Sequence, residues 1–290
     1  MSAGVSPIPT PPPVAHHPAT TVIQPTHGIG RLRLAEIWHY RDLLMLLTMR
    51  DVRVRYKQAA LGIGWAVLQP VAMAGVLYLF FGVLMGLDEK VAPVPYLVFV
   101  LAGVLPWTMF ESAVTAASGS VVANAAIVRK VYFPRLIVPL SAAGAPLVDY
   151  AIGLGVLLVA MLILGAAWSW QLVLLPLMIL SVLTAVLGIG VLLAALTVSY
   201  RDFRHLVPFM LRLLFFMTPV IYPVTLLPDA LRWLIALNPV GGTISAFRAA
   251  VLGTPIDYTA WGVSTLTGLV ALALGVTWFQ RAERRFADVV

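Results

Sequence analysis

Residues Thr48 to Pro70 read TMRDVRVRYKQAALGIGWAVLQP and join a basic cluster to a long apolar run. The first ten residues of this stretch hold four basic side chains, Arg50, Arg53, Arg55 and Lys57. No charged residue then follows until Asp88. Positive residues beside a membrane span are retained on the cytoplasmic side. The stretch therefore predicts a first transmembrane helix that begins in the cytoplasm, and every later span alternates from that starting point.

The composition of the chain is that of a membrane protein. Of its 290 residues, 61% are hydrophobic and 11% are charged, and charge-free runs longer than the roughly 20 residues needed to cross a bilayer recur along it. The net charge of +7 lies in short clusters between apolar runs, which favours membrane topology over nucleic-acid binding. Because the chain has no cysteine, a disulfide framework and a cysteine-ligated metal site are excluded.

These patterns predict an all-α polytopic membrane protein with six transmembrane helices. Residues 1–30, rich in Pro, Thr, Ala and His, predict a disordered cytoplasmic tail rather than a metal site. Residues 31–57 predict an amphipathic interface helix and a basic junction, and residues 58–290 the six-span domain. The predicted spans cover about 60–86, 96–118, 137–166, 171–198, 206–222 and 258–280.

The interface helix is predicted over residues 31–48. One side of it carries apolar residues at helical spacing, Leu34, Ile37, Trp38, Leu44 and Met45. Such a helix lies in the membrane interface with its tryptophan at headgroup level. Packing of the same side against a partner protein is an alternative that is compatible with the first.

Counting positive charges tests the orientation. With the amino terminus inside, 16 of the 19 Lys and Arg lie on the cytoplasmic side, and only Lys90, Arg232 and Arg248 lie outside. Both termini, including the segment at about 281–290, are therefore predicted to be cytoplasmic.

The link between the fifth and sixth predicted spans, about 223–257, contains two short apolar pieces, LLPDALRWLIAL and GTISAFRAAVLG. Each is too short to span, and Asn238 to Gly242 between them contains the helix breakers Pro and Gly. We expect a re-entrant helical hairpin that dips into the membrane from the outer face. An ordinary extracellular loop is the alternative.

The link between the second and third predicted spans reads NAAIVRKVYFPRLIVP from Asn124 to Pro139. Asn124 is expected to cap a short helix and Pro134 to stop it. Beside an apolar face on this helix, Tyr132 and Phe133 are expected to be exposed on the cytoplasmic side, where they would attract a protein partner. A basic turn without a partner is the alternative.

No catalytic motif is found in the sequence. It contains no phosphate-binding glycine loop, no HExxH and no GxSxG. Gly62-Ile63-Gly64 is interpreted as close helix packing at the start of the first span. We expect a protein that is not an enzyme and that takes its energy from another chain.

The sequence resembles the permease subunits of ABC exporters for bacterial surface polysaccharides, which export O-antigen, capsule and teichoic acid. The resemblance runs from about Arg31 to Arg285 and rests on four segments, LLTMRDVRVRYKQAALGIGWAVLQP, NAAIVRKVYFPRLIVP, TVSYRDFRHLVPFMLRLLFFMTPVIYP and LNPVGG.

The resemblance implies a homodimer in the inner membrane with two cytoplasmic ATPase subunits, which would bind ATP and Mg²⁺. No cofactor is expected in this chain itself. The link after the second span would be a coupling helix that docks on the ATPase, with a smaller contact at the next cytoplasmic link. The implied coupling residues are Asn124, Ile127, Val128, Arg129, Lys130, Val131, Tyr132, Phe133, Arg135, Arg201 and Asp202.

The implied substrate is a polysaccharide on a polyprenyl diphosphate lipid, with O-antigen favoured over a capsular or teichoic-acid polymer. Guanidinium groups pair with phosphate oxygens, so the entrance candidates are Arg50, Arg53, Arg55 and Arg204, whose alternative role is in topology and lipid contact. Sugars slide on aromatic faces, so the candidates for the glycan path are Tyr78, Phe81, Trp107, Phe110, Phe215, Phe216 and Tyr222. Ordinary packing is the alternative role of each.

Three ionisable residues lie within or at the edge of predicted spans, Glu111, Asp149 and Arg212. Such residues are functional candidates, and Asp149 is expected to pair with Arg212 or with another residue across the bundle. A proton-coupled mechanism would need one of them, which keeps a secondary transporter or channel as a rival class. A membrane glycosyl or acyl transferase is a second rival class. A drug or small-molecule exporter is a rival with the same fold.

Overall fold

The computed structural model describes residues 34–57, 61–91, 94–166, 168–283 and 286, and these residues form helices and no strand. The tail predicted at 1–30 lies outside the described residues. The elements are α1 (Leu34–His39), α2 (Arg41–Lys57), α3 (Gly64–Leu77), η1 (Tyr78–Leu84), α4 (Leu87–Val91), α5 (Tyr96–Ala123), α6 (Ala125–Lys130), α7 (Ile137–Ala142), α8 (Gly144–Ile163), η2 (Trp170–Leu174), α9 (Leu175–Ser199), α10 (Phe203–Met217), η3 (Val224–Leu226), α11 (Asp229–Leu237), α12 (Gly241–Leu252) and α13 (Tyr258–Glu283).

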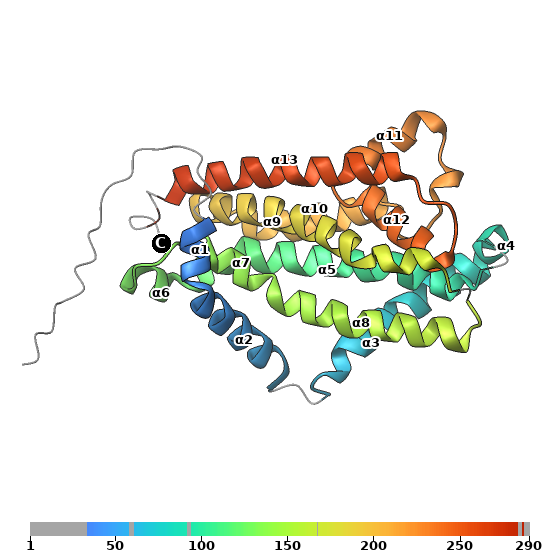
Figure 1. Ribbon diagram of the computed structural model, residues 1–290, viewed down its shortest axis with the longest axis horizontal. Coiled ribbons are helices and arrows are strands. Elements are labelled where there is room, and N and C mark those ends of the chain that lie inside the picture. The colour runs from blue at the N-terminus through green and yellow to red at the C-terminus, as the bar shows by residue number, and fades with distance from the viewer. Residues whose placement is uncertain (1–33, 58–60, 92–93, 167, 284–285, 287–290) are drawn as a thin grey trace, which may run out of the picture.

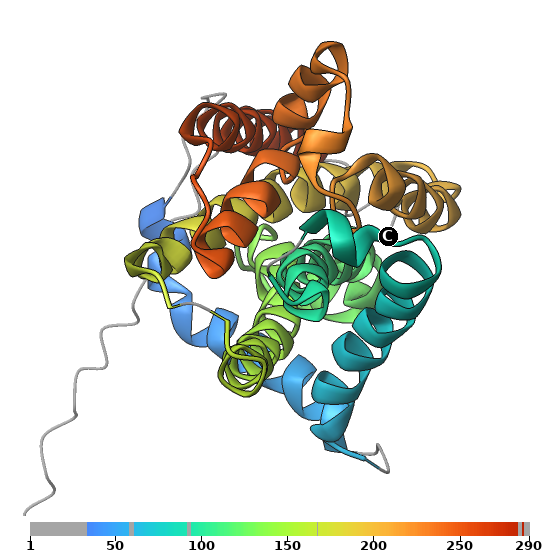
Figure 2. The ribbon, with the colours of Figure 1, turned by 90° about the vertical axis from the view of Figure 1, so that its right-hand side faces the viewer.

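The long helices lie side by side as a bundle (Figure 1). One end of the bundle carries α1, α6 and the last turns of α13, and α4 lies at the opposite end (Figure 1). Helix α5 runs through the centre of the bundle (Figure 2), where it packs against α3, α8, α9, α10 and α12. In the most apolar part of α5, 78% of the residues are buried, against 22–39% for the other long apolar helices.

Five helical segments are long and apolar enough to cross a membrane. They are Gly64–Leu84, Tyr96–Ala123, Ile137–Ile163, Trp170–Ser199 and Tyr258–Glu283. They correspond to the first, second, third, fourth and sixth predicted spans, so the chain is a multi-pass membrane protein.

The fifth predicted span, at 206–222, is shorter than expected. Helix α10 has 15 residues, or about 22 Å at ~1.5 Å per residue, against a hydrocarbon core of about 30 Å. It ends because Thr218 precedes Pro219, and a residue before proline is driven out of the helical region. Thr218 indeed has extended backbone angles, φ −94° and ψ 139°.

The helix break predicted at Asn238 to Gly242 is confirmed. Leu231–Leu237 and Gly241–Leu252 are bent by 95° at this point, and together they are apolar enough to count as one broken span or a re-entrant loop. The Asn238 side chain stabilises the bend, because its Oδ1 accepts from the Val240 N–H at 3.1 Å and its Nδ2 donates to the Thr218 hydroxyl at 2.9 Å.

Glycines let α9 and α13 pack closely. A methyl group on Gly188 of α9 would lie under 3.0 Å from backbone atoms of Ala271 and Leu272 in α13, and one on Gly275 would meet the Gly188 carbonyl oxygen. By contrast, the prediction that Gly62 and Gly64 serve close packing is wrong. Gly62 supplies a turn with φ 51°, and a methyl group there would meet nothing within 4 Å.

The interface helix predicted over residues 31–48 is two helices, α1 and α2, of which α2 continues to Lys57. Its apolar residues divide between two sides. Leu47 is buried, with Ile37 and Leu44 packed against the same core cluster. Trp38 and Met45 are exposed. The helix thus packs on the bundle with one side and presents apolar residues outward with the other.

Candidate functional site

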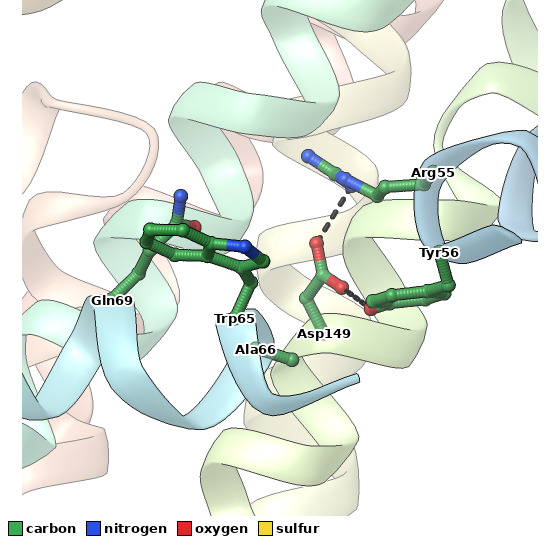
Figure 3. Close-up of a pocket in the computed structure, with 6 residues that line it drawn as sticks. All are labelled: Arg55, Tyr56, Trp65, Ala66, Gln69 and Asp149. Carbon is green, nitrogen blue, oxygen red and sulfur yellow. Dashed lines mark hydrogen bonds and ion pairs between the residues drawn. The ribbon is translucent and has the colours of Figure 1, made fainter. Parts of the chain in front are cut away.

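A polar cluster lies where α2, α3 and α8 meet (Figure 3). One Asp149 oxygen pairs with Arg55 Nη1 at 2.7 Å, and the other accepts a hydrogen bond from the Tyr56 hydroxyl. The expectation that Asp149 pairs across the bundle is therefore met by Arg55, whereas Arg212 is exposed on α10. The cluster ties the carboxyl end of α2 to α8.

The cluster borders an open cavity of about 310 Å³, lined by Arg55, Tyr56, Trp65, Ala66, Gln69 and Asp149. Burial and the hydrogen bond to Asp149 raise the pKa of the Tyr56 hydroxyl to about 12. Tyr56 therefore remains a donor at any physiological pH, and Asp149 is held by two donors. Because Arg55 is engaged with Asp149, its guanidinium is only partly free to bind another anion.

Charge reversal of the pair is expected to show coupling between α2 and α8. Arg55→Asp and Asp149→Arg should each lower the melting temperature of the purified protein, and the double exchange should recover part of the loss. The Arg55 side chain is 41% exposed, so after solvent screening the expected coupling is about 0.5–1 kcal/mol. Additive losses in the double variant would show that the pair contributes nothing.

A second hollow, of about 740 Å³, lies along α2 and combines basic and apolar side chains. Its lining consists of Asp42, Met45, Leu46, Met49, Arg50, Arg53, Val54 and Lys57. Arg50 is bound to the neighbouring Asp51 at 2.8 Å, whereas Arg53 is exposed. Arg204, the fourth predicted entrance arginine, is exposed at the start of α10. The four arginines thus lie on two helices, and Arg50 and Arg55 already pair with a carboxylate.

The link around α6, predicted to be cytoplasmic, has a buried side and an exposed side. Val128 and Phe133 are 5% and 4% exposed and pack in a cluster with Phe279 and Phe286. Arg135 anchors the link as well, because its Nη1 donates to the Glu283 carbonyl oxygen at 2.7 Å. The exposed side consists of Arg129, Lys130, Val131 and Tyr132.

Two details predicted for this link are wrong. Phe133 was expected to be exposed beside Tyr132, but it is buried because the chain turns it under α6 toward α13. Asn124 was expected to cap α6, but its Nδ2 donates to the Ser120 carbonyl oxygen of α5 at 2.9 Å, and α6 has no side-chain cap. Ile127 is partly buried. In the link between α9 and α10, Arg201 and Asp202 are exposed.

The aromatic residues predicted for a glycan path fall into two groups. Trp107, Phe110 and Phe215 are buried, and the Trp107 ring packs at 5.6 Å from the rings of both Phe110 and Phe215. These three form core packing in this conformation. The other four reach the protein surface or lie just below it, namely Tyr78, Phe81, Phe216 and Tyr222.

The sequence analysis missed the role of Arg248. This residue was counted among the outside charges, but only 5% of it is exposed. Its guanidinium donates to the carbonyl oxygens of Phe99, Val220 and Tyr222 at 3.2, 2.5 and 3.3 Å and lies 3.9 Å from the centre of the Phe99 ring. The available signal was an arginine inside the apolar run GTISAFRAAVLG, where an ionisable residue needs dedicated partners.

Long apolar helices around a central α5, a bent helix pair at one end and an exposed basic link at the other define a membrane permease. The chain belongs to the ABC-2 type transporter family, whose model matches residues 42–252.

Several curated relatives carry transport names. The chain is 30% identical over 262 residues to the O-antigen export system permease protein RfbA of Myxococcus xanthus, covering 88% of this chain and 98% of that protein. It is 28% identical over 253 residues to RfbA of Klebsiella pneumoniae, covering 86% and 95%. It is 26% identical over 248 residues to the polysialic acid transport protein KpsM of Escherichia coli, covering 82% and 92%.

Proposed function

We propose that this chain is the membrane-spanning subunit of an ATP-driven exporter of polyprenyl-diphosphate-linked O-antigen across the inner membrane. Its relatives named as O-antigen export permeases support the substrate class, since they match over most of both chains. A family of ABC-2 type transporters implies a partner that hydrolyses ATP. In this assignment two copies of the chain associate with two ATPase subunits, and both termini are cytoplasmic.

The exposed side of the α6 link is the observation that carries this proposal. An apolar and aromatic pair, Val131 and Tyr132, is 55% and 70% exposed beside Arg129 and Lys130. Tyrosine and arginine are enriched at protein interfaces. The buried side, with Val128 and Phe133, gives the exposed side a rigid support, so force applied at the link reaches α5 and α13.

In the proposed exporter, α10 and the bent pair α11–α12 complete the membrane domain, with the bent pair re-entrant from the outer face. Helices α1 and α2 lie at the cytoplasmic interface. Arg53 and Arg204, both exposed, are the best candidates to bind the lipid diphosphate, because neither is engaged with a carboxylate in the described part of the chain. Arg50 and Arg55 would need to leave Asp51 and Asp149 to do so.

A capsular polysaccharide is the second candidate substrate, because the chain is also similar to the polysialic acid transport protein KpsM. The two are separated by deleting the gene in its own host and following the polymers. Loss of surface O-antigen with an intact capsule supports the first candidate, and loss of capsule with intact O-antigen supports the second.

The test of the coupling link is the double variant Val131→Asp with Tyr132→Asp. Two carboxylates on the exposed side are expected to weaken ATPase binding by about 2 kcal/mol or more, or at least roughly 30-fold. The measurement is the amount of ATP-binding subunit that co-purifies from native membranes in mild detergent. Tyr258→Asp is the control, because Tyr258 is also exposed but lies at the start of α13, at the opposite end of the bundle.

Wild-type amounts of ATPase subunit on the double variant would rule out the link as its binding site. Purification of the unmodified chain without any nucleotide-binding partner would contradict the exporter assignment itself. Val128 is not a suitable position for this test, since a charge there disrupts the core beneath the link.

A further inference from the structure

Helix α5 is buried on all sides except one narrow stripe. Between Thr108 and Gly119, the residues that are not buried recur three or four positions apart, which puts them on one side of the helix. We call them the α5 stripe: Thr108, Glu111, Ser112, Thr115, Ala116 and Gly119. All of these residues are polar or small, and Glu111 lies close to the middle of the 28-residue helix.

The surfaces of the other long helices are of a different kind. Their exposed side chains are large and apolar, for example Leu68 on α3, Leu162 on α8, Leu180 on α9 and Leu266 on α13. Among the described residues, α5 contributes no large apolar side chain to the exposed surface. Lipid tails offer no hydrogen bonds and strongly disfavour a carboxylate. A surface that faces lipid therefore has large apolar side chains, like those of α3, α8, α9 and α13, and not the polar and small side chains of the α5 stripe.

The polar groups of the stripe make few hydrogen bonds within the bundle, although the Thr108 hydroxyl donates to the Leu105 carbonyl oxygen of α5 at 3.0 Å. Ser112 and Thr115 have no hydrogen-bond partner for their hydroxyls within the described part of the chain. Glu111 accepts one hydrogen bond, from Nε1 of the buried Trp107 at 3.0 Å, which orients the carboxylate and leaves its other oxygen available. A methyl group on Gly119 would meet nothing within 4 Å, so the space in front of the stripe is open there.

Contacts with neighbouring helices leave the stripe partly uncovered, with Thr115 and Ala116 exposed. Helix α10 contacts α5 through the rings of Phe215 and Trp107, 5.6 Å apart. The first span contacts the beginning of α5 through Tyr78 and Tyr96, whose rings are 6.2 Å apart. No described side chain of these elements hydrogen-bonds to the stripe.

We propose that the α5 stripe lines the aqueous passage of the permease and contacts the hydrated glycan as it moves. The hydroxyls of Ser112 and Thr115 and the carboxylate of Glu111 would exchange hydrogen bonds with water and with sugar hydroxyls. Single, exchangeable hydrogen bonds let a polar chain slide, whereas a closed set of partners would hold it in place. The inference rests on the proposed export function and moves the expected path from the buried aromatics to this polar surface.

The test uses the natural absence of cysteine. Thr108→Cys, Ser112→Cys and Thr115→Cys are introduced singly into the full exporter in membrane vesicles. The probe is the membrane-impermeant reagent methanethiosulfonate ethylsulfonate, which reacts with thiolates in water. Leu162→Cys, on the apolar surface of α8, and Ala113→Cys, buried on α5, are the matched controls. We expect the three stripe positions to react at least tenfold faster than both controls.

Two results would overturn the inference. Reaction of the stripe cysteines no faster than Leu162→Cys means that the stripe faces lipid. Efficient oxidative cross-linking of two Ser112→Cys chains, with slow reaction toward the probe, means that the stripe packs against a second copy of the chain.

The labelling experiment distinguishes failure of this inference from failure of the export assignment. If the ATPase subunit co-purifies and the stripe is not labelled, only this inference fails. If the stripe is labelled and no ATPase binds, the exporter assignment fails and an aqueous passage through some other type of transporter remains.

Discussion

Replacing Arg248 with methionine is expected to destabilise the protein by about 3 kcal/mol. Methionine fills much of the same volume but donates no hydrogen bond, so the carbonyl oxygens of Phe99, Val220 and Tyr222 lose their shared donor. An unsatisfied buried carbonyl costs about 1 kcal/mol or more. Val220 and Tyr222 lie outside helices, so no backbone ladder replaces the lost bonds. The measurement is thermal unfolding of the purified chain in detergent.

Two further variants make the Arg248 result specific. Arg248→Lys should fall between the wild-type protein and the methionine variant, because one ammonium group cannot reach three carbonyls held by a planar guanidinium. Arg281→Met, at an exposed arginine of α13, should change the melting temperature little. Equal melting temperatures for Arg248→Met and Arg281→Met would refute the structural role of Arg248.

Replacing Gly188 with alanine is expected to cost roughly 1–3 kcal/mol of stability. The added methyl group would lie under 3.0 Å from the backbone of Ala271 and Leu272, which cannot move aside as a side chain can. Helices α9 and α13 would have to separate along their shared length. The expected readout is a lower melting temperature and a larger loss of monodisperse protein on heating.

Gly155→Ala and Gly262→Ala are the matched controls for Gly188→Ala. Both glycines are in long helices, and a methyl group on either would meet nothing within 4 Å. Alanine favours a helix over glycine by up to about 1 kcal/mol, so these variants should be neutral or slightly more stable. If Gly188→Ala behaves like them, α9 and α13 do not pack at the distance seen here.

Most of the long helices of the chain were predictable because their signals are local. Long apolar runs, basic clusters and helix breakers act within a few residues, and five of the six predicted spans are present as long helices. The fifth span was predicted to be longer than it is, and the reason is also local. The Thr218-Pro219 pair that ends α10 lies inside the predicted span at 206–222. That signal was present in the sequence and its effect was underestimated.

The environment of individual side chains was less predictable because it depends on distant contacts. Tyr56 and Asp149 meet although 93 residues separate them, and nothing near either residue specifies the other. Helix α6 has only six residues, so its sequence allows either side to face the bundle. Val128 and Phe133 are buried in a cluster that includes Phe279 and Phe286 from the end of the chain and residues of α5, α7 and α9.

Helix α5 also has a mechanical consequence, because it connects the two ends of the molecule. One end of α5 accepts a hydrogen bond from Arg248 at Phe99, and the other end leads through Asn124 into α6. With 28 residues, α5 is a lever about 42 Å long at ~1.5 Å per residue. The residues from Phe99 to Ala123 span about 36 Å at ~1.5 Å per residue, so a tilt of about 5° about the α6 end moves Phe99 by about 3 Å, the length of a hydrogen bond. A small rotation at the α6 link is therefore enough to break the hydrogen bond between Arg248 and Phe99.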